Sequence, residues 1–139
     1  MSRKILMLSV FLYAGLQSHG QEITGIWKNI EKDEIQSHIE VFESDGKTHA
    51  RVIELFPTSH VTHCKKCKGA DKGASLKDIM LINNMRFENE KWIDGDILDP
   101  KSGKKYACQV ELKGDNTLKI RGYIGNPLLG KTFYWYRVE

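Results

Sequence analysis

Short segments in which apolar and polar residues alternate dominate this sequence from residue 23 onward, and Gly, Asp, Asn and Pro lie between them. A period of two is typical of β-strands that are buried on one face. The Asp45-Gly46 pair favours the positive φ angles of a tight hairpin turn. The pattern therefore predicts short antiparallel strands at 23–29, 37–43, 48–56, 79–87, 92–98, 105–112, 117–123 and 132–138.

About eight such strands predict an all-β fold, either an up-and-down barrel or a two-sheet β-sandwich. A closed barrel has no exposed edge strands and leaves room for one small ligand. The spacing of the strands alone does not decide between the two. Residues 57–75 interrupt the alternation, and a connection of this length is expected to be functional or cross-linked. Residues 76–80 are consistent with a helical turn before the strands resume.

Residues 1–20 have the three parts of a cleavable signal peptide. Arg3 and Lys4 provide the positive charge, residues 5–16 are apolar, and Ser18-His19-Gly20 places small residues before a cleavage site at Gln21. The apolar run is too short to span a membrane, which takes about 20 residues. We therefore expect an exported protein, periplasmic or secreted, without a transmembrane anchor, whose residues 21–139 form one domain.

The charge of the chain argues against nucleic acid as a partner. The net charge is +3, from 21 basic and 18 acidic residues. Without Arg3 and Lys4 the two signs nearly balance, and the basic residues form no clustered stripe of the kind that binds phosphates. The sequence also lacks a nucleophile elbow, a phosphate-binding loop and a metalloprotease motif. We therefore expect no catalytic residues and no cofactor.

Two cysteines lie in the interrupting segment, as Cys64-x-x-Cys67. In an exported protein such close thiols favour a disulfide. His60 and His63 precede them, so a tetrahedral zinc site is the less favoured alternative. The third cysteine, Cys108, alternates with core residues and is expected to be a buried thiol, although pairing with either other cysteine remains open.

Several motifs together resemble the DUF2147 family of small exported bacterial proteins, whose function is unassigned. The resemblance extends from Gly25 to Arg137 and rests on the order of the motifs rather than on any one of them. They are Leu55-Phe56-Pro57, Cys64-x-x-Cys67-x-Gly69, Gly95-x-Ile97-Leu98-Asp99-Pro100, Gly103-Lys104-x-Tyr106-x-Cys108, Arg121-Gly122-Tyr123-Ile124-Gly125, Leu129-Gly130-Lys131-Thr132 and Trp135-x-Arg137.

A second resemblance, to the lipocalin and calycin signature, favours the barrel over the sandwich. Gly25-x-Trp27 lies on the first predicted strand and Arg137 on the last. In that signature a Trp closes one end of the barrel and a basic side chain packs across it. A guanidinium over an indole contributes about 0.5–2 kcal/mol. The resemblance implies a barrel with a cavity for a small molecule.

Candidate ligand contacts lie on the later strands. Arg121 and Tyr123 alternate on one side of a predicted strand, where a guanidinium and a hydroxyl could bind a polar group. Tyr106 is a third candidate. The same two residues, Arg121 and Tyr123, are equally consistent with a solvent-facing surface. Asp94 and Asp96 share a face and could hold a cation, but carboxylates at such positions are more often solvated.

The leading hypothesis is an exported, non-enzymatic barrel that binds a small apolar molecule. An envelope module with a solid barrel and a Cys-x-x-Cys contact loop is the alternative, and an interior void distinguishes them. Metal binding through the His/Cys loop is a third hypothesis. The sequence leaves the ligand and the oligomeric state open.

Overall fold

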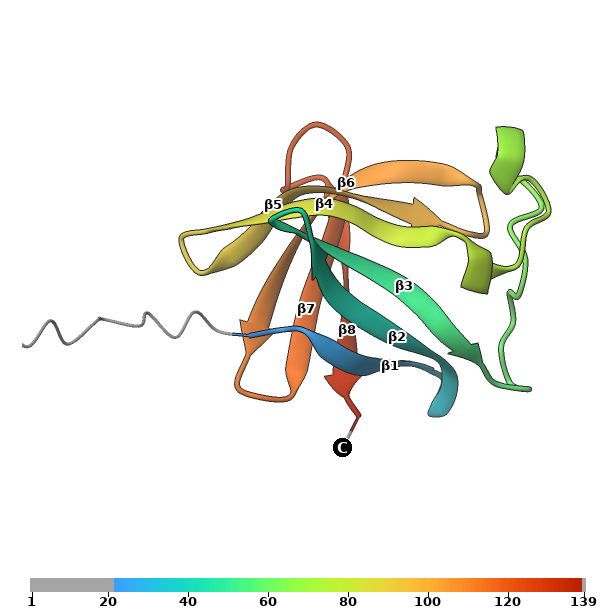
Figure 1. Cartoon of the computed structure of the whole chain (residues 1–139), viewed down its shortest axis with the longest axis horizontal. Coiled ribbons are helices and arrows are strands. Elements are labelled where there is room, and N and C mark those ends of the chain that lie inside the picture. Colours follow the sequence, from blue (N-terminus) through green and yellow to red (C-terminus); the bar gives the residue numbers. More distant parts are fainter. Residues whose placement is uncertain (1–21, 139) are drawn as a thin grey trace, which may run out of the picture.

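The chain forms a closed barrel of eight antiparallel strands in which each strand pairs with the next and β8 pairs with β1 (Figure 1). This computed structural model describes residues 22–138, so the predicted signal peptide lies outside the described residues. None of the helices within 22–138 has the length and hydropathy of a membrane-crossing segment. The strands are β1 (Gly25–Glu31), β2 (Glu34–Ser44), β3 (Lys47–Leu55), β4 (Met80–Glu88), β5 (Lys91–Asp99), β6 (Lys104–Lys113), β7 (Thr117–Tyr123) and β8 (Gly130–Arg137).

The up-and-down barrel predicted from the sequence is thereby confirmed, and the two-sheet alternative is wrong. Three of the turns are two-residue hairpins whose central residues both have positive φ angles. These are Asp45-Gly46, Lys32-Asp33 and Asn89-Glu90, and only the first contains glycine. Turns of this kind match the right-handed twist of the strands that they join. They fix the strand register and therefore which side chains face the interior.

The barrel has a closed end and an open end. The N-terminal segment, the short turns after β2, β4 and β6, and the end of β8 lie at the closed end. The connections after β1, β3, β5 and β7 lie at the open end, and two of these are long (Figure 1). The interior of the closed half is filled by buried side chains that include Trp27, Val41, Ala50, Met85, Trp92, Val110, Leu118 and Ile120.

The β3–β4 connection, residues 56–79, folds against the open end rather than extending freely. It contains two short 3-10 helices, η1 (Gly69–Asp71) and η2 (Leu76–Asp78). An isolated bridge pairs His63 with Ser75, and the Leu76 side chain is buried in the core. The helical turn expected over residues 76–80 corresponds to η2. The segment that breaks the strand pattern is therefore an ordered wall beside the mouth of the barrel.

Candidate functional site

A cavity of about 970 Å³ occupies the open half of the barrel. Residues from three of the four open-end connections line it, including Ser59, Pro100 and Leu129, and so does Glu31 at the end of β1. Ligand cavities in proteins commonly measure about 300–1,000 Å³. The space is therefore large enough for one small organic molecule.

The floor of the cavity is apolar and comes from inward-facing strand residues. Ile39, Val52, Ile97 and Trp135 line it and are otherwise buried. They lie directly above the packed closed half, because each belongs to a strand that continues into that core. A ligand in the lower part of the cavity would meet hydrocarbon and one indole ring. Its buried part should therefore be mainly apolar.

Polar side chains gather higher up, toward the mouth. Half-buried Tyr106 and Tyr123 lie on the wall, and both were predicted as ligand contacts. The Tyr106 hydroxyl can donate a hydrogen bond to a ligand or accept one from it. Tyr123 lies on the same face of β7 as Arg121 and borders the cavity at the open end of the strand. Apolar residues such as Val61 and Leu129 line the same level. The mouth therefore suits a mainly apolar molecule that carries a polar group. The other polar lining residues include Gln36, Ser37, His60, Asp99, Lys101 and Lys131.

Hydrogen bonds anchor the beginning of the β3–β4 connection across β2. The Gln36 carbonyl oxygen accepts from the Phe56 amide at 3.1 Å and from the Ser59 hydroxyl. The Gln36 side-chain oxygen accepts from the His60 amide at 3.1 Å. Because these groups are satisfied within the chain, the rim beside β2 is fixed without a ligand.

The cysteine loop forms another part of the rim. Cys64 and Cys67 are joined by a disulfide, with Cα atoms 5.3 Å apart, which is the pairing that the sequence favoured. The β5–β6 turn packs tightly on this loop at Gly103, where a Cβ atom would lie 2.3 Å from the Lys66 carbonyl oxygen. The loop, the turn and the barrel therefore meet in one packed unit.

The disulfide also bears on the alternative of a zinc site. Two cysteines that are bonded to each other offer no thiolate to a metal ion. Across residues 22–138, no three His, Cys, Asp or Glu side chains converge to hold a metal. Asp94 instead accepts a hydrogen bond from Arg86 at 2.6 Å, and Asp96 accepts one from Asn83 at 3.5 Å.

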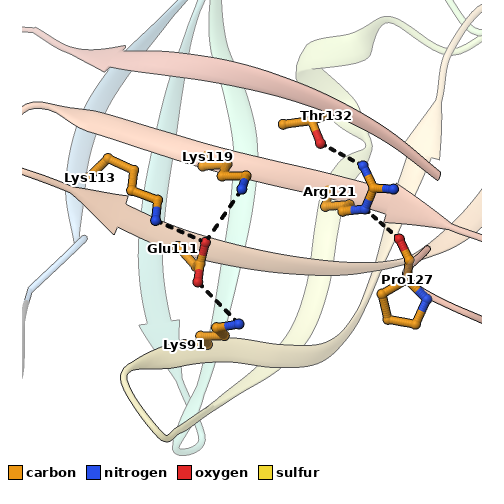
Figure 2. Close-up of polar contacts among 7 residues, drawn as sticks. All are labelled: Lys91, Glu111, Lys113, Lys119, Arg121, Pro127 and Thr132. Carbon is orange, nitrogen blue, oxygen red and sulfur yellow. Dashed lines mark hydrogen bonds and ion pairs between the residues drawn. The ribbon is translucent and has the colours of Figure 1, made fainter. Parts of the chain in front are cut away.

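Arg121 does not lie where the predicted ligand contact requires it. It is absent from the cavity wall. Its guanidinium donates to the carbonyl oxygen of Pro127 and, at 2.7 Å, to the Thr132 hydroxyl (Figure 2), and also to the carbonyl oxygen of Leu128. The physical reason is the pleat of β7, which directs Arg121 outward and its neighbours inward. Arg121 holds the β7–β8 loop in place instead.

Gly25, Trp27 and Arg137 meet at the closed end, as the barrel signature predicts. The Arg137 side chain lies over the Trp27 ring, and the Trp27 indole nitrogen donates to the Ile23 carbonyl oxygen at 2.9 Å. Gly25 has a φ of +134°, and a Cβ atom there would lie 3.5 Å from an Arg137 nitrogen. This contact is remote from the cavity mouth, so its role is structural.

The sequence interpretation missed Gly122 and the apolar floor as parts of the site. Gly122 faces inward on β7, and a Cβ atom there would make ordinary contacts with Ile97 at 3.5 Å and Tyr106 at 3.9 Å. It lines the cavity. The missing side chain leaves part of the interior empty. The signal available in the sequence was a glycine at a position where the alternation of β7 places an inward-facing side chain.

Comparison with known proteins agrees with this architecture. Residues 25–137 match the DUF2147 family, described as an uncharacterized protein conserved in bacteria. No curated protein matches the sequence. Among solved structures, protein HP1028 from Helicobacter pylori, described as belonging to the lipocalin family, superposes with a TM-score of 0.72. The two are 23% identical over 85% of this chain and 84% of the other, so the likeness concerns the fold.

Proposed function

This chain belongs to the DUF2147 family, and we propose that it is an exported, non-catalytic protein that binds one small, largely apolar molecule inside its barrel. The observation that carries the proposal is the cavity of about 970 Å³ with an apolar floor. The solid-barrel alternative requires a filled interior, and the open half is hollow. The lipocalin-like fold is compatible with the same role.

The distribution of side chains supports binding rather than catalysis. The floor residues Ile39, Ile97 and Trp135 have no group that exchanges a proton or forms a covalent bond at neutral pH. The titratable residues, such as His60 and Asp99, lie at the mouth, where water has access. Asp99 is engaged there in capping its own turn, because it accepts from the Ser102 hydroxyl at 2.8 Å.

Export is supported by the leader pattern of residues 1–20 and by the buried disulfide. Cys64 and Cys67 are both buried. Structural disulfides form and persist mainly in oxidising compartments. The proposed location is therefore the periplasm or the outside of the cell.

The first experiment is native mass spectrometry of the mature protein from an exporting host, compared with its denatured mass. A small organic mass that is lost on denaturation would identify the ligand. The variant Gly122→Phe is designed to fill the cavity, because its ring would enter the space between Ile97 and Tyr106. We expect this variant to carry no ligand. Ala107→Phe adds a similar ring on the exposed outer face of β6 and should keep it.

A contact-range quencher tests the position of the ligand. Trp135 lines the cavity, whereas Trp92 packs at the closed end against Phe87. A brominated fatty acid used as probe should therefore quench the fluorescence of Trp92→Phe and leave that of Trp135→Phe nearly unchanged. Equal quenching of both variants, or unchanged binding by Gly122→Phe, would contradict binding in the barrel.

A further inference from the structure

The β7–β8 loop exposes three large apolar side chains beside the mouth of the cavity. Ile124 is 71% exposed, Leu128 83% and Leu129 75%, and we call these three residues the apolar tip. In Figure 1 the loop stands out from the barrel as an orange-red arch. Ile124 and Leu129 also line the cavity, so the tip is continuous with its apolar interior. Exposed apolar residues that cluster in this way mark an interaction site.

The loop is held in this exposed arrangement by its own hydrogen bonds. The Arg121 guanidinium donates to two loop carbonyl oxygens, that of Pro127 (Figure 2) and that of Leu128. The Asn126 side chain accepts from the Leu128 amide at 2.9 Å. These hydrogen bonds satisfy polar backbone groups of the loop within the chain, while its three large apolar side chains stay exposed. A surface built in this way is prepared for an apolar partner.

Exposed lysines lie along the mouth from the β3–β4 connection, through the β5–β6 turn, to the start of β8. Residues 65–68, 101–105 and 131 contain seven lysines and no carboxylate, and we call them the basic rim. The first two parts are neighbours, because Gly103 packs on Lys66. Lys101 and Lys131 line the same cavity as Ile124 and Leu129. The seven are Lys65, Lys66, Lys68, Lys101, Lys104, Lys105 and Lys131, and all are exposed.

These lysines differ from those on the barrel wall. Lys91, Lys113 and Lys119 converge on the Glu111 carboxylate at 3.2, 3.4 and 3.9 Å (Figure 2). None of the seven lysines in the basic rim forms an ion pair within residues 22–138. At the open end, the exposed carboxylates of Glu31, Asp33 and Glu34 gather on the β1–β2 side. Asp99 at the mouth accepts a hydrogen bond from the Ser102 hydroxyl, and Asp71 and Asp78 lie in the β3–β4 connection. The unpaired positive charge of the basic rim therefore lies on one side of the mouth.

We propose that the apolar tip and the basic rim dock this protein on the surface of an anionic lipid bilayer. Apolar side chains enter the interface between headgroups and acyl chains, while lysines contact the anionic headgroups. The mouth of the cavity then opens at the membrane. An apolar ligand can pass between bilayer and barrel without crossing water. Docking itself does not require a ligand and is measured separately.

The test is co-sedimentation of the mature protein from an exporting host with vesicles, after its mass has shown that residues 1–20 are absent. We expect binding to vesicles that mix phosphatidylglycerol with phosphatidylcholine, and little binding to phosphatidylcholine alone. Raising NaCl to about 0.5 M should weaken the binding, because exposed charges are screened. Failure to bind the anionic vesicles at low salt would overturn the proposal.

Two variants separate the contributions of the tip and the rim. Leu128→Ser with Leu129→Ser should weaken vesicle binding about tenfold or more, because each leucine loses part of its burial. The control Ile53→Ser with Phe87→Ser removes exposed apolar residues elsewhere and should retain binding. Melting curves of all variants show whether each one is folded.

For the rim, Lys101→Gln, Lys104→Gln and Lys105→Gln together should weaken binding about fivefold per lysine. Lys47→Gln, Lys113→Gln and Lys119→Gln change the net charge equally at the wall and closed end, and should have little effect. Equal weakening by the two triple variants would overturn the proposal. So would a protein whose apolar tip joins two copies in solution, recognised as a dimer that Leu128→Ser with Leu129→Ser converts to a monomer.

Discussion

The guanidinium of Arg137 lies over the indole ring of Trp27, with its Cζ atom 4.3 Å from the ring centroid. Arg137 also donates to the carbonyl oxygens of Asp115 at 3.0 Å and Glu22 at 3.2 Å. One side chain therefore connects β8 with β1, with the β6–β7 turn and with the segment before β1. This matters because β1 and β8 share a short ladder of three residue pairs, whereas β7 and β8 share seven.

Arg137→Ala should lower the free energy of unfolding by about 1–3 kcal/mol, from the cation–π contact and the lost hydrogen bonds. Denaturant unfolding followed by fluorescence measures this change. Arg51→Ala is the matched control, because Arg51 lies 4.8 Å from the Phe42 ring in an exposed contact within one hairpin. Arg51→Ala should lower the free energy of unfolding by much less than Arg137→Ala does. Equal losses would show that Arg137 has no special part in closing the barrel.

Glu111 makes stability depend on pH at the acidic end. Burial raises the pKa of its carboxyl, but hydrogen bonds and charges from Lys91 and Lys113 outweigh this and hold the pKa below its ordinary value of 4.5. A carboxylate whose folded pKa is lowered stabilises the fold above its unfolded pKa. That stabilisation is lost as the pH falls through the folded pKa.

Glu111→Gln should therefore lower stability by about 0.5–1 kcal/mol at neutral pH, as expected for a network of partly exposed ion pairs. The difference from the unmodified protein should shrink as the pH falls below about 4.5. Urea unfolding at several pH values measures it. Glu40→Gln, which removes a pair with one partner, Arg51, should have a smaller effect. A difference that stays constant with pH would contradict the role of Glu111.

Much of the fold could be predicted because side-chain alternation reports directly on burial. The bounds predicted for β7, 117–123, coincide with the structure, and the other strands differ by a few residues. The turns Lys32-Asp33 and Asn89-Glu90 could not be recognised in the same way. Both adopt positive φ angles without glycine. Asp33 and Asn89 are of types that adopt such angles comparatively often, but Lys32 and Glu90 are not, so neither pair carries the signal of Asp-Gly.

The candidate site was less predictable, because it depends on what the interior lacks. Alternation placed Tyr106 and Tyr123 near a ligand, and both line the cavity. Alternation with Leu118 and Ile120 indicates that Arg121 faces outward, but it could not show that Arg121 binds the carbonyl oxygens of its own loop. The residues in that contact are six and seven positions apart in the sequence. They are joined by a loop, and the path of a loop leaves no periodic pattern in the sequence. Empty volume around Gly122 likewise depends on neighbouring strands and not on local sequence.

Cys108 provides a further pH-dependent prediction. Burial, with a contribution from the Asp96 charge, raises the pKa of its thiol to about 12, from an ordinary value of 9.0. The folded state therefore keeps the thiol protonated at pH values where the unfolded state has lost the proton. The contribution of this thiol to the free energy of unfolding is fully present below pH 9.0 and decreases as the pH rises toward 12. The fall has a limiting slope of about 1.4 kcal/mol per pH unit.

The variant Cys108→Ala isolates this effect, because lysines and tyrosines also titrate in the same range. Its stability should fall less steeply than that of the unmodified protein above pH 9.0. In addition, a thiol reagent such as Ellman's reagent should react with Cys108 in denaturant but hardly in the folded protein. Rapid reaction of the folded protein would show that the thiol is accessible and would contradict both expectations.

Gly103 should be intolerant of any side chain for two separable reasons. Its φ is +72°, and a Cβ atom there would lie 2.3 Å from the Lys66 carbonyl oxygen. Gly114 has a similar φ of +64° but nothing within 4 Å, so Gly114→Ala measures the backbone strain alone, about 1 kcal/mol. Gly103→Ala should lower the free energy of unfolding by clearly more than this. It should also speed tryptic cleavage of the folded protein after the lysines that flank Cys64 and Cys67, since the β5–β6 turn would be displaced from the cysteine loop. Equal losses for the two variants, with unchanged cleavage, would show that the turn does not hold the loop.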